Sequence, residues 1–250
     1  MNKEIKLSLA QQDVYYEQIM NLESALYNTG GYIIFNGDFN HTEFRKIVEG
    51  CFRDFDIFNL KFDFSGDEPV QYLNDPKETV LIDDLDLSSQ SEPYFKAIDW
   101  MQGQFNVAFD IQQNRWYRFT LIKLSNHQYI LFGCFHHLIS DVFGFAILAI
   151  YFIDQYKKSL DRDLSPVTAY PSYLDAVRRS NEYLVSEQYD KDAIYWKEKY
   201  HVIPDLILSQ KKQHEDRGLS FSIPISKSDS HLLNRVSEEY KVGVSQLTIA

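Results

Sequence analysis

Two adjacent histidines and an aspartate lie where two apolar segments of the chain meet. His136 and His137 end the segment QYILFGCFHH, residues 128–137, and Asp141 follows four residues after His137. A neutral histidine can accept a proton near pH 7 and can therefore act as a general base. Polar groups at such a junction are costly to bury unless they are used or paired. These three residues are therefore a candidate site.

The two histidines are expected to point in opposite directions. Successive residues of a strand face opposite sides of a sheet, so His136 and His137 cannot both serve one site. One of them is expected to pack or to hydrogen-bond inside the protein. A metal site is disfavoured, because the pair diverges and no cluster of other ligands lies near it in the sequence. A structural His137 and an Asp141 that only caps a helix are the alternatives.

The elements that must position the site can be predicted from composition and periodicity. Residues 128–135 are rich in β-formers and too short to span a membrane, which predicts a buried strand. The segment 115–125 is the predicted hairpin partner, joined to it by Asn126 and His127. The apolar segment 143–156 predicts a helix directly after the site.

The segments before and after this hairpin also carry clear patterns. Ser8 is expected to cap a helix whose apolar stripe is Ala10, Val14, Tyr15 and Ile19. The other predicted elements are a strand over 30–36, a helix after Asn40, a strand over 57–64 paired with 69–73, an acidic loop over 82–89, a helix over 92–104, an amphipathic helix over 174–200, a strand over 219–225 and a capped helix over 226–240. This order predicts an α+β layered sandwich.

Length, charge and cysteine content bound the class of protein. The 250 residues are enough for one large domain or two small ones, and 44% of them are hydrophobic. The net charge of −11 argues against a nucleic-acid partner, which needs a basic face. Cys51 and Cys134 lie in apolar settings and are expected to be reduced thiols of a cytoplasmic protein. No signal peptide and no membrane span are predicted.

Several ordered motifs resemble those of condensation domains of nonribosomal peptide synthetases, within the chloramphenicol-acetyltransferase superfamily. HHLISD resembles the signature HHxxxDG at His136, His137 and Asp141. Further matches are SxAQ at Ser8, Ala10 and Gln11, the strand entry at Tyr27 and Asn28, FDI at 109–111, the strand at 119–124 and the helical segment at 173–200. The resemblance covers essentially the whole chain. It implies a chloramphenicol-acetyltransferase-like two-layer α/β sandwich with a mixed sheet.

The same resemblance implies a reaction and roles for the site residues. Such domains join a carrier-bound acyl or peptidyl thioester to the amine of a carrier-bound aminoacyl thioester. His137 is implied to accept the amine proton, or to position the amine and stabilise the tetrahedral intermediate. Asp141 is implied to hold the loop through a charge pair, and His136 to pack behind the site. No cofactor is expected to bind directly, since the substrates ride on phosphopantetheine arms of donor and acceptor peptidyl carrier proteins, beside adenylation modules.

This sequence departs from the family pattern at two positions that concern the site. Val142 stands where the signature has glycine, and a β-branched side chain there could crowd the backbone approach of a ligand. Asn59 stands where the motif RHExLRTxF has the arginine that pairs with the signature aspartate. Asparagine supplies hydrogen bonds but no charge, so Lys61 or Arg53 is an alternative source of the cation.

The expected domain organisation is a complete first lobe over residues 1–165, and inter-lobe helices with the beginning of a second lobe over 166–250. Because the family's site is a tunnel between two lobes, a chain that stops there is expected to fold but to be inactive alone. Two other functions remain open. One is a free-standing acyltransferase of the chloramphenicol-acetyltransferase type, whose signature lies near the C-terminus. The other is a condensation-like module that docks partners without catalysis.

Overall fold

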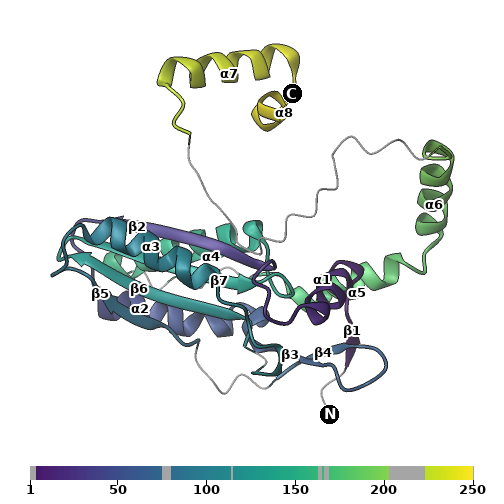
Figure 1. Cartoon of the computed structure of the whole chain (residues 1–250), viewed down its shortest axis with the longest axis horizontal. Coiled ribbons are helices and arrows are strands. Elements are labelled where there is room, and N and C mark those ends of the chain that lie inside the picture. Colours follow the sequence, from purple (N-terminus) through teal and green to yellow (C-terminus); the bar gives the residue numbers. More distant parts are fainter. Residues whose placement is uncertain are drawn as a thin grey trace. The chain divides into compact units, whose positions relative to one another are not determined.

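The computed structural model describes residues 4–74, 80–113, 115–162, 165, 169–202 and 223–249. The chain divides into two compact units, residues 1–217 and 218–250. The described part of the second unit contains α7 (Lys227–Tyr240) and α8 (Val244–Ile249). The elements of the first unit (Figure 1) are β1 (Ile5–Lys6), α1 (Leu9–Met20), β2 (Asn28–Asn36), α2 (His41–Gly50), η1 (Cys51–Arg53), η2 (Asp56–Asn59), β3 (Leu60–Asp63), β4 (Val70–Leu73), β5 (Asp83–Asp86), α3 (Pro93–Phe105), η3 (Ile111–Gln113), β6 (Tyr117–Ser125), β7 (Gln128–His136), α4 (Val142–Asp161), α5 (Tyr173–Tyr183) and α6 (Glu187–Lys199).

The histidine pair lies at the end of β7, an inner strand of the larger sheet. Its strand order is β2-β7-β6-β5, in which β5 runs parallel to β6 and the other pairs are antiparallel. A smaller sheet has the order β1-β4-β3. Helices α2 and α4 pack on one face of the larger sheet and α3 packs on the other (Figure 1). The predicted α+β class with a mixed sheet is confirmed.

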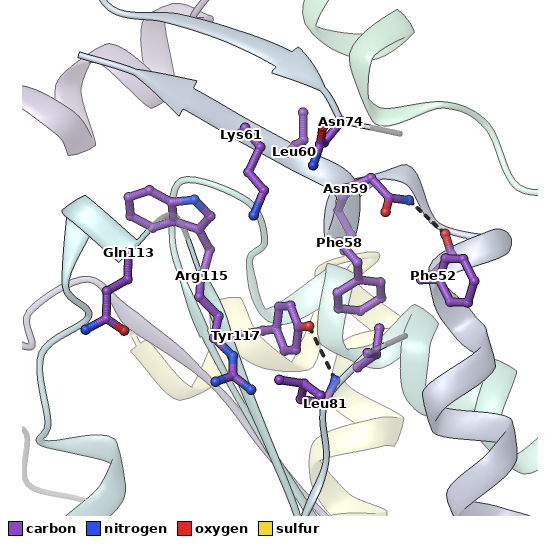
Figure 2. Close-up of a pocket in the computed structure, with 13 residues that line it drawn as sticks. Phe52, Phe58, Asn59, Leu60, Lys61, Asn74, Leu81, Gln113, Arg115 and Tyr117 are labelled. Atoms are coloured by element: carbon purple, nitrogen blue, oxygen red, sulfur yellow. Dashed lines mark hydrogen bonds between the residues drawn. The ribbon is translucent and has the colours of Figure 1, made fainter. Parts of the chain in front are cut away.

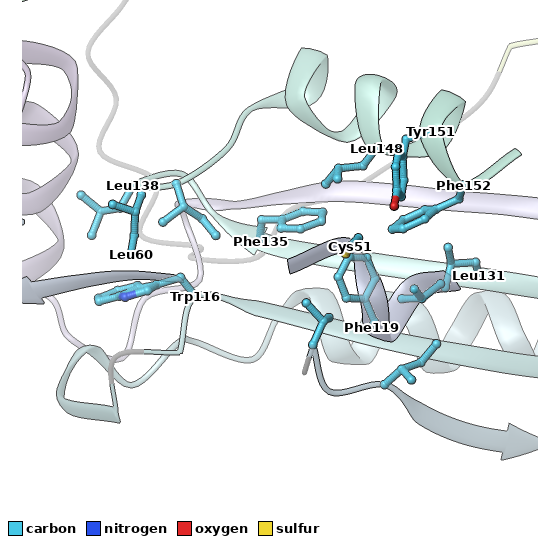
Figure 3. Close-up of a cluster of buried hydrophobic side chains, with 14 of the residues drawn as sticks. Cys51, Leu60, Trp116, Phe119, Leu131, Phe135, Leu138, Leu148, Tyr151 and Phe152 are labelled. Carbon is cyan, nitrogen blue, oxygen red and sulfur yellow. The ribbon is translucent and has the colours of Figure 1, made fainter. Parts of the chain in front are cut away.

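Alternation along β7 divides the core between the two faces of this sheet. Leu131 and Phe135 face the cluster under α2 and α4, whereas Ile130, Phe132 and Cys134 face the cluster under α3. Both sets are buried, so β7 is apolar on both sides, as a central strand must be. Figure 3 shows the first cluster, in which aromatic rings from β6, β7 and α4 meet around the buried thiol of Cys51.

Helix α4 approaches the sheet closely because glycines lie beneath it. Gly31 and Gly133 are paired across β2 and β7, and the ring of Phe145 lies over both. A Cβ atom at Gly133 would lie 2.9 Å from Cε2 of Phe145, and one at Gly31 would lie 3.0 Å from Cε1. The start of α4, which follows the histidine pair directly, is therefore fixed against the sheet by this ring.

The structure differs from the sequence-based expectation in the segment that precedes β3. Residues 57–59, predicted as strand, belong to the short 3-10 helix η2 (Asp56–Asn59), and β3 begins at Leu60. Asp56 explains the difference. Its carboxylate accepts hydrogen bonds from the hydroxyl of Ser172 (2.6 Å) and the backbone N–H of Tyr173 (2.9 Å), which cap the start of α5. The strand pattern cannot reveal a partner 116 residues away.

The acidic segment predicted as a loop contains the edge strand β5. Its exposed carboxylates meet cations from neighbouring elements: Arg45 pairs with Asp84, and Lys123 lies 3.7 Å from Asp86. The Arg45 guanidinium also donates to the carbonyl of Ile82. These ion pairs allow an acidic segment to lie at the edge of a sheet.

Two predicted elements in the second half of the chain are also different. The predicted helix over 174–200 is two helices, α5 and α6, which are separated at residues 184–186. Of the predicted strand over 219–225, residues 223–225 are described and have no strand, and residues 219–222 lie outside the described residues. The helices predicted after Ser8, after Asn40, over 92–104 and over 226–240 are confirmed as α1, α2, α3 and α7.

Substitution of glycines should separate backbone strain from steric overlap. Gly30 has a φ of 146°, and its added Cβ would lie 2.1 Å from the carbonyl oxygen of Gly133. Gly37 has a φ of 106° but open space around it, and Gly103 has open space alone. We expect Gly30→Ala to lower the free energy of unfolding by about 3 kcal/mol or more, and Gly37→Ala by about 1–2 kcal/mol. Gly103→Ala, in helix α3, should raise it by about 0.5–1 kcal/mol. Urea denaturation tests this order, and equal losses for Gly30→Ala and Gly37→Ala would contradict the close approach of β2 and β7.

Candidate active site

The two histidines lie on opposite sides of the end of β7. His136 is the last residue of the strand and is only 1% exposed, whereas the side chain of His137 is exposed. Cys134 shares the face of His136, as the two-residue period of a strand requires. Only His137 is therefore open to a reactant.

His136 is held in the interior by both ring nitrogens. Its Nε2 lies 3.0 Å from Oε1 of Gln18, and its Nδ1 accepts a hydrogen bond from the backbone N–H of Leu138 (3.2 Å). The rings of Phe109 and Trp116 contact it edge to face. Burial, and after it the neighbouring His137, lower the pKa of His136 to about 4. His136 is therefore neutral at pH 7 and serves the interior.

The backbone that carries His137 is held by residues from three other elements. Its own N–H donates to the carbonyl of Tyr27, at the entry to β2 (2.8 Å). The following carbonyl, of Leu138, accepts from Nε2 of Gln11 on α1 (3.0 Å) and from the hydroxyl of Tyr173 on α5 (3.2 Å). His137 thus projects from a short segment that is anchored on both sides, as a catalytic side chain requires.

A cavity of about 580 Å³ opens beside His137. Its walls come from α1, the residues before α4, α4 itself, η2 and the start of α5. Most of the lining residues are apolar; the residues with polar side chains are Ser8, Gln11, His137, Ser140, Asp141, Tyr170, Ser172 and Tyr173. Tyr173 is half-buried, and desolvation of its hydroxyl, with the charges of Asp141 and Asp56, raises its pKa to about 12, so the phenol stays protonated. The arrangement suits a reaction in which an imidazole moves a proton in an apolar setting.

Asp141 is the N-cap of α4. Its Oδ1 accepts a hydrogen bond from the backbone N–H of Gly144 (2.7 Å), and the residue is exposed. Within the residues that the structure describes, no ion pair reaches Asp141. The described contacts of Asp141 are therefore those of a helix cap.

The two departures from the family pattern lie at different distances from the cavity. Val142 is the first residue of α4, and its side chain is 66% exposed. Asn59 ends η2 and lines a separate cavity of about 170 Å³, together with Lys61 and Arg115 (Figure 2). The Asn59 side chain donates to the carbonyl of Phe52 (3.0 Å). The structure brings His137 and Asp141 together at one cavity but does not bring Asn59 or Lys61 to it.

Three residues that hold the site were not predicted from the sequence as site residues. These are Gln18, Tyr173 and Gln11, of which Gln11 belongs to the SxAQ match. Gln11 and Gln18 are the buried positions of α1, and their amides pair with polar groups of other elements. The available signal was their seven-residue spacing, which places both on one face of a helix whose apolar stripe is poor.

Within the described ranges, no set of three or more His, Cys, Asp or Glu side chains could hold a metal ion. None of the described helices has the length and apolar character needed to cross a membrane.

A family model described as "Condensation domain" matches residues 1–250 of the chain. Among curated proteins, the chain is 24% identical to a dimodular nonribosomal peptide synthase of Bacillus subtilis, over 82% of this chain and 9% of that protein. It is 27% identical to one plipastatin synthase protein of the same species, over 60% of this chain and 6% of that protein. It is 22% identical to enterobactin synthase component F of Escherichia coli, over 82% of this chain and 16% of that protein.

Solved structures show the same fold. The starter condensation domain of the rhizomide synthetase RzmA matches with a TM-score of 0.72 and 22% identity, over 79% of this chain and 48% of that chain. The first condensation domain of the calcium-dependent antibiotic synthetase, in complex with a substrate analogue, matches with a TM-score of 0.81 and 19% identity. That match covers 99% of this chain and 59% of that chain, so this sequence spans about half the length of its solved relatives.

Substitution of Asp141 should distinguish a cap from a charge pair. Asparagine caps helices about as well as aspartate does, so Asp141→Asn should leave the free energy of unfolding nearly unchanged. Asp141→Ala removes the acceptor for Gly144 and should lower it by about 0.5–2 kcal/mol. Chemical denaturation of the two variants measures both effects. Equal and large losses for the two would show that the negative charge of Asp141, and not its capping bond, stabilises the segment.

Proposed function

We propose, from the premise that this chain belongs to the condensation-domain family, that it forms an amide bond between two carrier-bound substrates. The donor is an acyl or peptidyl thioester and the acceptor is the amine of an aminoacyl thioester. Each rides on the phosphopantetheine arm of a peptidyl carrier protein, so the chain needs no cofactor of its own. The observation that carries this function is the exposure of His137 to a largely apolar cavity at an anchored end of β7.

The reaction assigns a proton transfer to His137. The acceptor amine attacks the thioester carbonyl carbon, a carbon–nitrogen bond forms and the carbon–sulfur bond breaks. The nitrogen loses one proton, and the departing thiolate gains one. An unprotonated imidazole of His137 can accept the first proton, and the resulting imidazolium can deliver a proton to the sulfur. One side chain therefore balances the reaction without a metal.

The surrounding residues supply the setting for this transfer. Apolar walls favour a reacting group over water, and in a condensation domain of full family length the second lobe would close the site and strengthen the electrostatic contacts at the reacting atoms. The anchoring of Leu138 by Gln11 and Tyr173 limits the movement of His137 toward or away from the amine. Holding a base and two reactants in place accounts for several kcal/mol of a barrier in general, about 7–11 in the best cases.

The partners follow from the same assignment. The curated relatives are synthases of peptide products, many times longer than the part that this chain matches. We infer donor and acceptor carrier domains and a neighbouring adenylation module as partners. The cytoplasm is the inferred location, which the two buried free thiols, Cys51 and Cys134, support.

Replacement of His137 tests this function. In a protein that contains this sequence within a condensation domain of full family length, His137→Ala should lower amide formation by about 100-fold or more, because general-base catalysis is lost. The assay follows product from donor and acceptor carriers that are both loaded. His127→Ala is the matched control, since this exposed histidine lies in the turn between β6 and β7.

The other outcomes decide between the alternative functions. Full amide formation by His137→Ala would remove the base from the proposal. Transfer of the acyl group to a free amine without any carrier would indicate a free-standing acyltransferase. Carrier binding without product, in the wild-type protein as well as the variant, would indicate a module that only docks partners.

Val142 provides a second test at the same site. Because its side chain is 66% exposed, it should not obstruct the cavity beside His137. We expect Val142→Gly to change turnover by less than about twofold and to lower the free energy of unfolding by about 0.5–1 kcal/mol, the usual cost of glycine in a helix. A loss of activity beyond the loss of stability would show that Val142 contacts a substrate.

A further inference from the structure

Gln18, in the last turn of α1, is a buried polar residue that contacts the site from within. It is 3% exposed, and Oε1 of its amide lies 3.0 Å from Nε2 of His136. Its Nε2 donates to two backbone carbonyls in the loop after α1, those of Asn21 (2.9 Å) and Ser24 (3.1 Å). This amide therefore joins α1, the loop that enters β2 and the end of β7.

The three contacts fix the orientation of the amide. Both N–H groups of the Gln18 amide are used by carbonyls, which can only accept. A rotation that exchanged the amide oxygen and nitrogen would place oxygen against both carbonyls and would lose both bonds. The Gln18 oxygen therefore faces His136, so Nε2 of His136 must carry the hydrogen. The second ring nitrogen agrees, because Nδ1 of His136 accepts from the N–H of Leu138 and must be bare.

This tautomer is connected to the backbone that carries His137. Leu138 donates its N–H to Nδ1 of His136, and its carbonyl is held by Gln11 and Tyr173. A hydrogen on Nδ1 would face the N–H of Leu138, and two donors cannot bond each other. The peptide after His137 would then have to move, and the two bonds to its carbonyl would be strained.

We propose that Gln18 is a positioning residue, which fixes His136 as its Nε2–H tautomer and thereby holds the backbone on which His137 is mounted. The consequence for catalysis rests on the proposed function of His137. The tautomer itself does not, because it follows from hydrogen bonds between α1 and β7. Gln18 acts through His136 and is not expected to touch a substrate.

The groups around His136 show which contact decides whether its ring is charged, and this contact is the one with the Gln18 amide. Among the residues that the structure describes, those on other elements are Gln18, Tyr27, Phe109 and Trp116, and His137 lies next to it in the chain. Tyr27 is the titratable member from another element, and its phenol donates to Glu17, which raises its pKa to about 12. A carboxylate at position 18 would be the first anion to contact the ring, and it would favour the imidazolium.

Imidazole nitrogen NMR of the 250-residue chain tests the proposal directly. In the wild type we expect His136 to show a protonated Nε2 and a bare Nδ1 from about pH 8 down to about pH 5. Gln18→Glu should raise the pKa of His136 by about one unit or more, protonate Nδ1 and speed amide exchange at Leu138. Gln12→Glu is the matched control, because this substitution adds the same charge to the same helix. The Nε2 of Gln12 donates to the carbonyl of Leu7 and not to a group at His136.

The wild-type spectrum keeps the proposal falsifiable if Gln18→Glu fails to fold. An Nδ1–H tautomer, or titration of His136 near its ordinary pKa of about 6.5, would overturn it. A folded Gln18→Glu variant with the wild-type His136 signals would overturn it as well. An equal shift in Gln12→Glu would show a long-range charge effect and would also count against it.

Kinetics separate positioning from simple stabilisation. In the full-length-domain protein, the rate of amide formation by Gln18→Glu relative to wild type should fall by about twofold or more between about pH 8 and about pH 5, as His136 becomes charged in the variant. A ratio that stays constant with pH would indicate a structural role only. If His137→Ala were fully active, the proposed role of His137 as the base would be wrong. The NMR result would still test the His136 tautomer independently.

Discussion

The hydrogen bonds of the short segment 136–138 are the constraint on which the site depends. A strand end normally leaves backbone groups free for water, but here three of them are bound by other groups of the protein. The N–H of His137 is bound by Tyr27, the N–H of Leu138 by the ring of His136, and the carbonyl of Leu138 by Gln11 and Tyr173. These bonds hold the segment in the observed conformation, and they thereby fix the backbone from which the His137 side chain projects.

The rest of the first unit can be understood as support for these partners. Gln11 is itself paired reciprocally with Gln71 of β4, through bonds of 3.0 and 2.8 Å, so the smaller sheet also bears on Leu138. Asp56 caps α5 and thereby places Tyr173. The ring of Phe145 packs on Gly31 and Gly133 and fixes the start of α4. Two buried amides and the half-buried carboxylate of Asp56 connect elements here, and each has hydrogen-bond partners; an unpaired buried group would cost about 1–3 kcal/mol.

Sequence patterns predicted the larger elements and the opposite directions of the two histidine side chains, but not the contacts between elements. The β6–β7 hairpin and α4 followed from apolar periodicity, and the divergence of His136 and His137 followed from the period of a strand. The apolar stripe expected on α1 was misleading: Ile19 and Ala10 are exposed, and the buried positions are Gln11 and Gln18. A hydrophobic pattern cannot identify glutamines that are buried because other elements pair with them. For the same reason it could not identify Asp56 as the cap of a helix far along the chain.

The structure changes the interpretation of Val142, which stands at the glycine position of the signature, where a β-branched side chain could crowd the approach of a ligand. A position favours glycine where the backbone has a positive φ or where another atom occupies the space of a Cβ. Val142 begins α4 and points outward, so it is tolerated. Two residues later, an added Cβ at Gly144 would lie 2.3 Å from Oγ of Ser140, and the N–H of Gly144 is the group that Asp141 caps. Among the described residues, the close approach at the start of α4 therefore falls on Gly144, whereas the side chain of Val142 faces solvent.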